Sequence, residues 1–177
     1  MLYIKEKILS LYTKQLAKTR RVVRINVGFQ HAQNMGILYS AESPQKHEVV
    51  RHFVTQLDKL GKKVAVLCYA IAPLQVTHLD FPTITRRDLR LWGAITDPKA
   101  QYFVNTPFDY LYQVDLEGHP MLDYLLAKSQ AKCRVGYYDA SRTGLFEMMV
   151  KFDKKNNGND IDSLVAQMAH YTQLLRA

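Results

Sequence analysis

The chain has 177 residues, of which 47% are hydrophobic and 23% are charged, close to the averages for globular proteins. This composition excludes extensive disorder, and the length suits one domain with its own core. The formal net charge of +8 favours contact with an anionic partner, although a run of charge can also be a solvated face.

The positive charge is concentrated at the N-terminus. Residues 1–24 contain seven Lys or Arg and one Glu, a net charge of +6, so the remaining residues carry +2. Residues 2–20 have the pattern of an amphipathic helix. Its apolar stripe can dock on the protein's own body, on a partner or second copy, or on a membrane surface. We therefore expect a basic N-terminal helix or arm at 1–24 and a single α/β domain at 25–177.

A strand, a helix and a strand follow this arm. Residues 35–40 predict the first strand, and Ser43 with Pro44 predicts the start of a helix that Gly61 ends. Residues 64–70 predict the second strand. The buried face of the helix is predicted to contain Val49, Val50, Phe53, Val54, Leu57 and Leu60.

Residues 108–137 contain a second unit of the same kind. The aromatic and β-branched run 110–115 predicts a buried strand, a leucine-bearing helix follows to Ser129, and 133–136 predicts another strand. Two such crossovers predict an α/β protein with a three-layer, Rossmann-like architecture, in which helices cover both faces of a mostly parallel sheet. The four strands named so far should be adjacent in that sheet.

The other elements are shorter. The second and third core strands are joined without a helical pattern, which predicts one antiparallel or edge strand within 73–107. Asp97 predicts the cap of a short helix. A last strand is predicted at 146–152, and a C-terminal helix from about Asp160. The core face of that helix is predicted to contain Ile161, Leu164, Val165, Met168, Tyr171 and Leu175.

Ligands of open α/β sheets bind outside the carboxyl ends of the strands. The candidate ligand-binding residues at these ends are Ser40, Ser43, Asp115, Glu117, His119, Tyr137 and Arg142. The turn after the first strand contains no glycine, which argues against a dinucleotide-binding or phosphate-binding loop. The polar residues after the central strand could act as acid, base or metal ligands, or simply solvate the loop. We expect no metal and no cofactor.

Two features bear on location. Cys68 and Cys133 lie in apolar runs and are expected to be buried, reduced thiols. No apolar run reaches the 18 residues typical of a membrane span, and the N-terminus does not have the pattern of a signal peptide. We therefore expect a cytoplasmic protein.

The order of these segments resembles a bacterial family of small conserved domains of unknown function. That resemblance covers nearly the whole chain and implies an α/β fold without implying an activity. Residues 108–137, with Arg134, Val135, Gly136 and Tyr137, also resemble part of the N-terminal half of heptosyltransferase-like glycosyltransferases. The chain departs from that pattern because its first strand lacks the glycine-bearing turn and because no second, nucleotide-sugar-binding domain is expected.

These observations favour a non-catalytic α/β protein that joins an anionic or protein assembly through its basic arm. The first partner expected is RNA or a ribonucleoprotein, and the helix could also mediate homo-oligomers. The residues predicted to contact nucleic acid are Lys14, Lys18, Arg20, Arg21 and Arg24. The alternative is a small enzyme or binding protein for a phosphorylated or nucleotide-like ligand at the strand carboxyl ends.

Overall fold

The computed structural model describes residues 2–19, 22–25, 27–71, 79–88, 95–152 and 160–176. Thirteen helices and strands lie within these ranges. In chain order they are α1 (Leu2–Thr19), β1 (Asn34–Ala41), α2 (Pro44–Lys59), β2 (Lys63–Ala70), β3 (Thr83–Ile84), η2 (Arg86–Asp88), α3 (Pro98–Asn105), β4 (Tyr110–Gln113), α4 (Pro120–Lys128), β5 (Cys133–Tyr137), η3 (Ala140–Leu145), β6 (Met148–Val150) and α5 (Asp160–Leu174).

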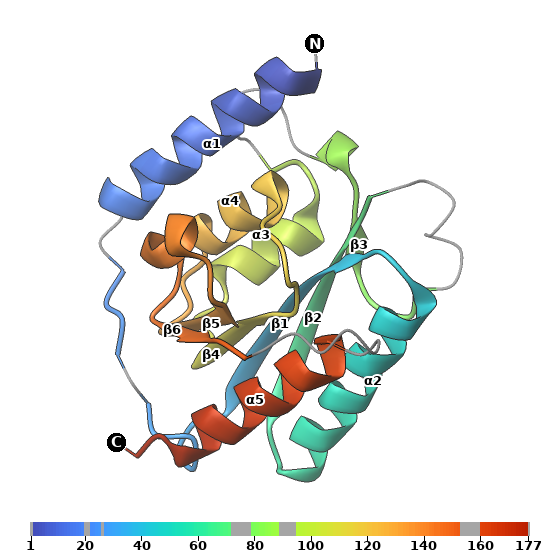
Figure 1. The fold of residues 1–177 in the computed structure, drawn as a ribbon, viewed down its shortest axis with the longest axis vertical. Helices are drawn as coiled ribbons and strands as arrows, with labels where there is room; N and C mark the ends of the chain where they lie inside the picture. Colours follow the sequence, from blue (N-terminus) through green and yellow to red (C-terminus); the bar gives the residue numbers. More distant parts are fainter. Residues whose placement is uncertain are drawn as a thin grey trace.

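The strands form one six-stranded sheet in the order β3-β2-β1-β4-β5-β6. The pairings between these six strands are all parallel, and Ile37 in β1 lies opposite Val66 in β2 and Tyr112 in β4. Helices α2 and α5 cover one face, whereas α1, α3 and α4 cover the other (Figure 1). The predicted three-layer, Rossmann-like α/β fold is confirmed, and the four predicted core strands are adjacent.

Each face of the sheet has its own hydrophobic core. Side chains alternate between the faces along a strand, so Leu38 and Leu111 pack toward α4 whereas Ile37 and Tyr112 pack toward α2. The Tyr112 ring meets Phe53 of α2 edge-on, with centroids 5.1 Å apart. This alternation sets which polar residues at the strand ends face α1 and α4.

Local sequence signals fix the ends of α2. The Ser43 side chain caps the first turn by accepting a hydrogen bond from the Lys46 backbone N–H, and Pro44 occupies the first helical position. At the other end Gly61 adopts a φ of 75°, the left-handed conformation that ends helices. Cys68 and Cys133 are both buried free thiols, as expected.

Four sequence predictions need correction. The edge strand β3 pairs with β2 in parallel, so the antiparallel alternative is wrong. Strand β6 spans only Met148–Val150, not 146–152. Leu60 is 52% exposed because it is the C-terminal cap of α2, beyond the last helical residue Lys59, and Tyr171 is 44% exposed because it lies at the border of the apolar stripe of α5. The residue next to Tyr171, Thr172, is buried in its place, and its Oγ1 accepts a hydrogen bond from the Tyr112 hydroxyl at 3.1 Å.

The basic helix α1 docks on the body of the protein, against α4 and η3 (Figure 1). Leu9 and Thr13 are buried at this contact, and Tyr12 and Leu16 are partly buried. Of the three docking options that the sequence leaves open, the structure therefore shows the first. No helix within the described part of the chain is long and apolar enough to span a membrane.

Candidate functional site

The carboxyl ends of β1 and β4 lie side by side at the centre of the sheet. After β1 the chain passes into α2 on one face, and after β4 it passes into α4 on the opposite face (Figure 1). Sheets of this topology hold ligands in the crevice at such a reversal. Ser40 near the end of β1 and Asp115 just after β4 meet here, so two of the predicted site residues are brought together.

Asp115 is the centre of a buried polar cluster. Its Oδ1 accepts hydrogen bonds from the Ser40 backbone N–H at 3.2 Å, from the Ser40 hydroxyl and from the Lys46 ammonium. Lys46 Nζ also donates to Ser40 Oγ at 2.9 Å and lies 3.4 Å from Glu42 Oε2. The Lys46 and Asp115 side chains are each only 3% exposed. The cluster thus joins β1, α2 and the segment after β4.

Only one of the two carboxylate oxygens of Asp115 is satisfied. Its Oδ2 is buried and has no hydrogen-bond partner among the described residues. Burial raises the pKa of Asp115 to about 6, although the Lys46 ammonium and the Ser40 hydrogen bonds favour the charged form. Oδ2 is therefore a buried hydrogen-bond acceptor that no described residue uses.

Lys46 is not among the site residues predicted from the sequence, yet the sequence contains a signal for it. It precedes Val49 by three residues and Val50 by four, so it lies on the stripe that α2 buries. Lysine is rarely fully buried unless it is paired. A lysine on a buried stripe, one turn after a strand end, therefore indicates a buried ion pair at that end.

A second buried ion pair lies on the α4 face and contains the predicted residue Arg142. Its Nη2 donates to Asp123 Oδ1 of α4 at 2.5 Å and to Gln113 Oε1 at the end of β4. Gly118 makes room for this side chain, because a Cβ there would lie 3.0 Å from both Cδ and Nε of Arg142. Burial raises the pKa of Asp123, although the nearby guanidinium favours the charged carboxylate.

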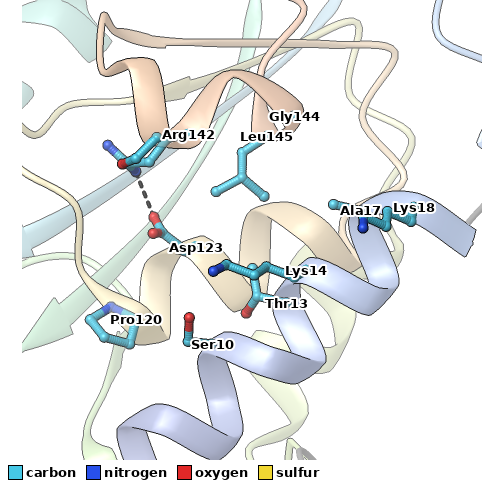
Figure 2. Close-up of a pocket in the computed structure, with 11 residues that line it drawn as sticks. Ser10, Thr13, Lys14, Ala17, Lys18, Pro120, Asp123, Arg142, Gly144 and Leu145 are labelled. Carbon is cyan, nitrogen blue, oxygen red and sulfur yellow. Dashed lines mark hydrogen bonds and ion pairs between the residues drawn. The ribbon is translucent and has the colours of Figure 1, made fainter.

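A pocket of about 410 Å³ opens beside this ion pair, between α1, α4 and η3 (Figure 2). Figure 2 shows the Lys14 side chain extending from α1 into the space that Asp123 and Arg142 border. Its lining includes three cationic side chains and one carboxylate, so its charge is positive. The polar side chains that line it are Ser10, Thr13, Lys14, Lys18, Asp123, Ser141 and Arg142.

The residues predicted to contact nucleic acid are separated by the structure. Lys14 and Lys18 line the pocket and are exposed. Arg24 instead donates to the Ala131 carbonyl, and its Nε lies 3.6 Å from Glu147 Oε1, so it attaches the segment after α1 to the body. Arg20 and Arg21 lie outside the described residues.

The other predicted site residues have local structural roles or face solvent. Ser43 caps α2, and the His119 ring caps α4 while packing 4.6 Å, centroid to centroid, from the Tyr69 ring. Tyr137 meets the Phe152 ring edge-on, and Glu117 is exposed. Within the described ranges, no group of three or more His, Cys, Asp or Glu side chains is placed to hold a metal ion.

Comparison with known proteins assigns a family and no activity. A family model described as a family of unknown function (DUF6913) matches residues 5–175. Neither the search of curated proteins nor the search of solved structures gives a match. The resemblance of residues 108–137 to heptosyltransferase-like enzymes therefore stays a prediction.

Proposed function

We propose that this chain, which belongs to the family of unknown function DUF6913, binds a small phosphate-bearing ligand in the pocket between α1, α4 and η3. The observation that carries this proposal is the placement of Lys14, Lys18 and Arg142 around one cavity. Phosphate oxygens accept charge-assisted hydrogen bonds from ammonium and guanidinium groups. Docking of α1 on the body is what assembles the three cations.

Size supports a small ligand. Pockets for small molecules are typically about 300–1,000 Å³, and this one, at about 410 Å³, lies near the lower end. A compact phosphate ester suits that volume better than a dinucleotide does. The turn after β1, which lacks glycine, also argues against a dinucleotide at the carboxyl end of the sheet.

The state of α1 bears on the competing hypothesis of an RNA-binding arm. A free arm can follow a phosphate backbone, whereas α1 has Leu9 and Thr13 buried against the body. Arg24, which the RNA hypothesis expects to contact a phosphate, already donates a hydrogen bond to the Ala131 carbonyl. These contacts favour a ligand that enters the pocket over one that α1 wraps around.

The test is isothermal titration calorimetry with ethyl phosphate and with a single-stranded RNA oligonucleotide. In the double variant Lys14→Glu and Lys18→Glu, ethyl phosphate affinity should fall at least about tenfold, since each change reverses one charge of the pocket. Lys99→Glu is the matched control, because Lys99 is exposed in the first turn of α3 and is not part of the pocket lining. Its affinity should equal that of the unmodified chain.

Two outcomes would overturn the proposal. One is no binding of ethyl phosphate at millimolar concentration, and the other is equal affinity in the double variant. Salt-sensitive RNA binding that the double variant loses, without any ethyl phosphate binding, would instead establish the basic-arm hypothesis.

A further inference from the structure

The pocket between α1, α4 and η3 has walls that belong to two separate parts of the molecule (Figure 2). Five of its 11 lining residues lie on α1, namely Ser10, Thr13, Lys14, Ala17 and Lys18. The other six belong to α4 and η3, which connect strands of the sheet. A ligand that contacts both walls therefore has a complete site only while α1 is docked.

Few buried side chains hold α1 on the body. Among residues 7–19, the part of α1 whose burial the structure describes, only Leu9 and Thr13 are buried. The Thr13 hydroxyl donates to the Leu9 carbonyl at 2.8 Å, so this bond stays within α1. In α2, by contrast, the buried hydrophobic side chains are Val49, Val50, Phe53 and Leu57. Elements with few buried apolar contacts open at a lower free energy than the rest of a fold.

The charges around the pocket oppose docking when no anion is bound. Docking brings Lys14 and Lys18 of α1 to the cavity that Arg142 also borders, and like charges repel. Asp123, the carboxylate in the lining, is already paired with Arg142 at 2.5 Å. A phosphate group has a charge of about −1.5 to −2 at pH 7 and would offset this repulsion.

The chain is attached to the body again directly after α1. Arg24 donates to the Ala131 carbonyl, and its Nε lies 3.6 Å from Glu147 Oε1. These bonds do not involve α1, so they can persist when α1 leaves the surface of α4 and η3. Undocking of α1 therefore does not require the sheet to unfold.

We propose that the ligand of this pocket holds α1 on the body, an inference that rests on the proposed function. The ligand-free protein exchanges between a docked and an undocked α1, and the ligand binds the docked form. Binding and docking then favour each other by the same factor. An undocked α1 loses most of its helical structure, because most helical stability in proteins comes from tertiary packing. The ligand thereby controls whether the basic helix is held on the body or released.

The first test is hydrogen–deuterium exchange of the unmodified chain, with and without ethyl phosphate, followed by mass spectrometry. Without ligand, the amides of α1 should exchange at least about tenfold faster than those of the central strand β4, because α1 opens by itself. With ligand at about 20 times its Kd, exchange in α1 should slow about 20-fold, since the ligand must leave before α1 undocks. The Kd comes from the calorimetric titration.

The second test weakens docking without changing the pocket lining. Leu9 is 9% exposed and Leu11 is 68% exposed on the same helix, and neither lines the pocket. Leu9→Ala should lower ethyl phosphate affinity at least about threefold, because only the docked fraction binds. Leu11→Ala is the matched control and should keep the affinity of the unmodified chain. Leucine and alanine are both good helix formers, so the two variants differ mainly in docking.

The outcomes separate this inference from the proposed function. Exchange in α1 at the same rate with and without saturating ethyl phosphate would overturn the inference and leave phosphate binding intact. Ligand-free exchange in α1 as slow as in β4, or equal affinity in Leu9→Ala and Leu11→Ala, would also overturn it. No binding of ethyl phosphate would overturn the proposed function and this inference with it. The exchange experiment on the unmodified protein decides the question even if Leu9→Ala fails to fold.

Discussion

The two buried ion pairs at the carboxyl end of the sheet differ in what surrounds them. Lys46 and Asp115 are enclosed by β1, α2 and the segment after β4, and Lys46 Nζ contacts oxygens of Ser40 and Glu42 as well. Arg142 and Asp123 are also largely buried, yet they border a cavity of about 410 Å³. The first pair attaches α2 to the end of the sheet, whereas the proposed function has the second exchange one partner for a ligand.

Breaking the enclosed pair, Lys46 and Asp115, should give the largest loss of stability. Lys46→Met should lower the free energy of unfolding by about 3–5 kcal/mol, because it leaves the Asp115 carboxylate buried without its counter-charge. Urea denaturation followed by circular dichroism at pH 7 measures this loss. Adding Asp115→Asn to the same chain should restore part of it. A loss below about 1 kcal/mol, the value of an exposed pair, would mean that the cluster is hydrated.

Truncating a core side chain in the helix that supports the Arg142–Asp123 pair should lower the free energy of unfolding nearly as much. Leu125 is 1% exposed in α4, the helix that carries Asp123. Leu125→Ala should destabilise the protein by about 2–5 kcal/mol, as cavity-forming leucine truncations do. Denaturation under the same conditions gives the value. A loss below about 0.5 kcal/mol would mean that this side of the pocket wall is not held by core packing.

The pH dependence of the free energy of unfolding should reveal the raised pKa of the Asp115 carboxyl. The pKa of Asp115 is about 6 in the folded protein, above the ordinary value of 3.8. Its protonated form therefore stabilises the fold below pH 4, and that contribution is lost as the pH rises through about 6. The loss between pH 4 and 7 should be about 2 kcal/mol, and Asp115→Asn should lack it. Identical pH profiles for the two chains would contradict this assignment.

A change in the pair formed by Arg142 and Asp123 should have the smallest effect. This effect should be tighter ligand binding and not a loss of stability. Asp123→Asn removes the carboxylate that competes with phosphate for Arg142, so affinity for ethyl phosphate should rise about three- to tenfold. Calorimetry at low ionic strength provides the measurement. Weaker binding would mean that Asp123 is needed to orient Arg142 toward the ligand.

The sequence predicts the central sheet well because its signals are local. Two apolar runs, 35–40 and 64–70, flank a helix with a Ser43 cap and a Gly61 stop, and all these features are confirmed. Strand β3, in contrast, has only two residues, Thr83 and Ile84, and its pairing depends on β2. A segment that short has no periodicity of its own to detect.

The candidate site is predictable only in part, for a similar reason. Parallel strands align their carboxyl ends, so Ser40 and Asp115 can be placed together from the sequence. The pocket depends instead on where α1 docks, and the sequence leaves docking on the body, on a partner or on a membrane open. The positions of Lys14 and Lys18 beside Arg142 follow from that tertiary contact. Residue types alone do not specify it.

The most direct measurement of the central claim is a titration of the ¹⁵N-labelled protein with ethyl phosphate, followed by the side-chain N–H signals of arginine and lysine. The account predicts that the signals of Arg142 and Lys14 shift along one saturable curve, while that of the enclosed Lys46 stays unchanged. The Arg142 signal should shift only if the phosphate binds in the pocket that Arg142 lines. An unmoved Arg142 signal, or a shift of Lys46 in its place, would contradict the account.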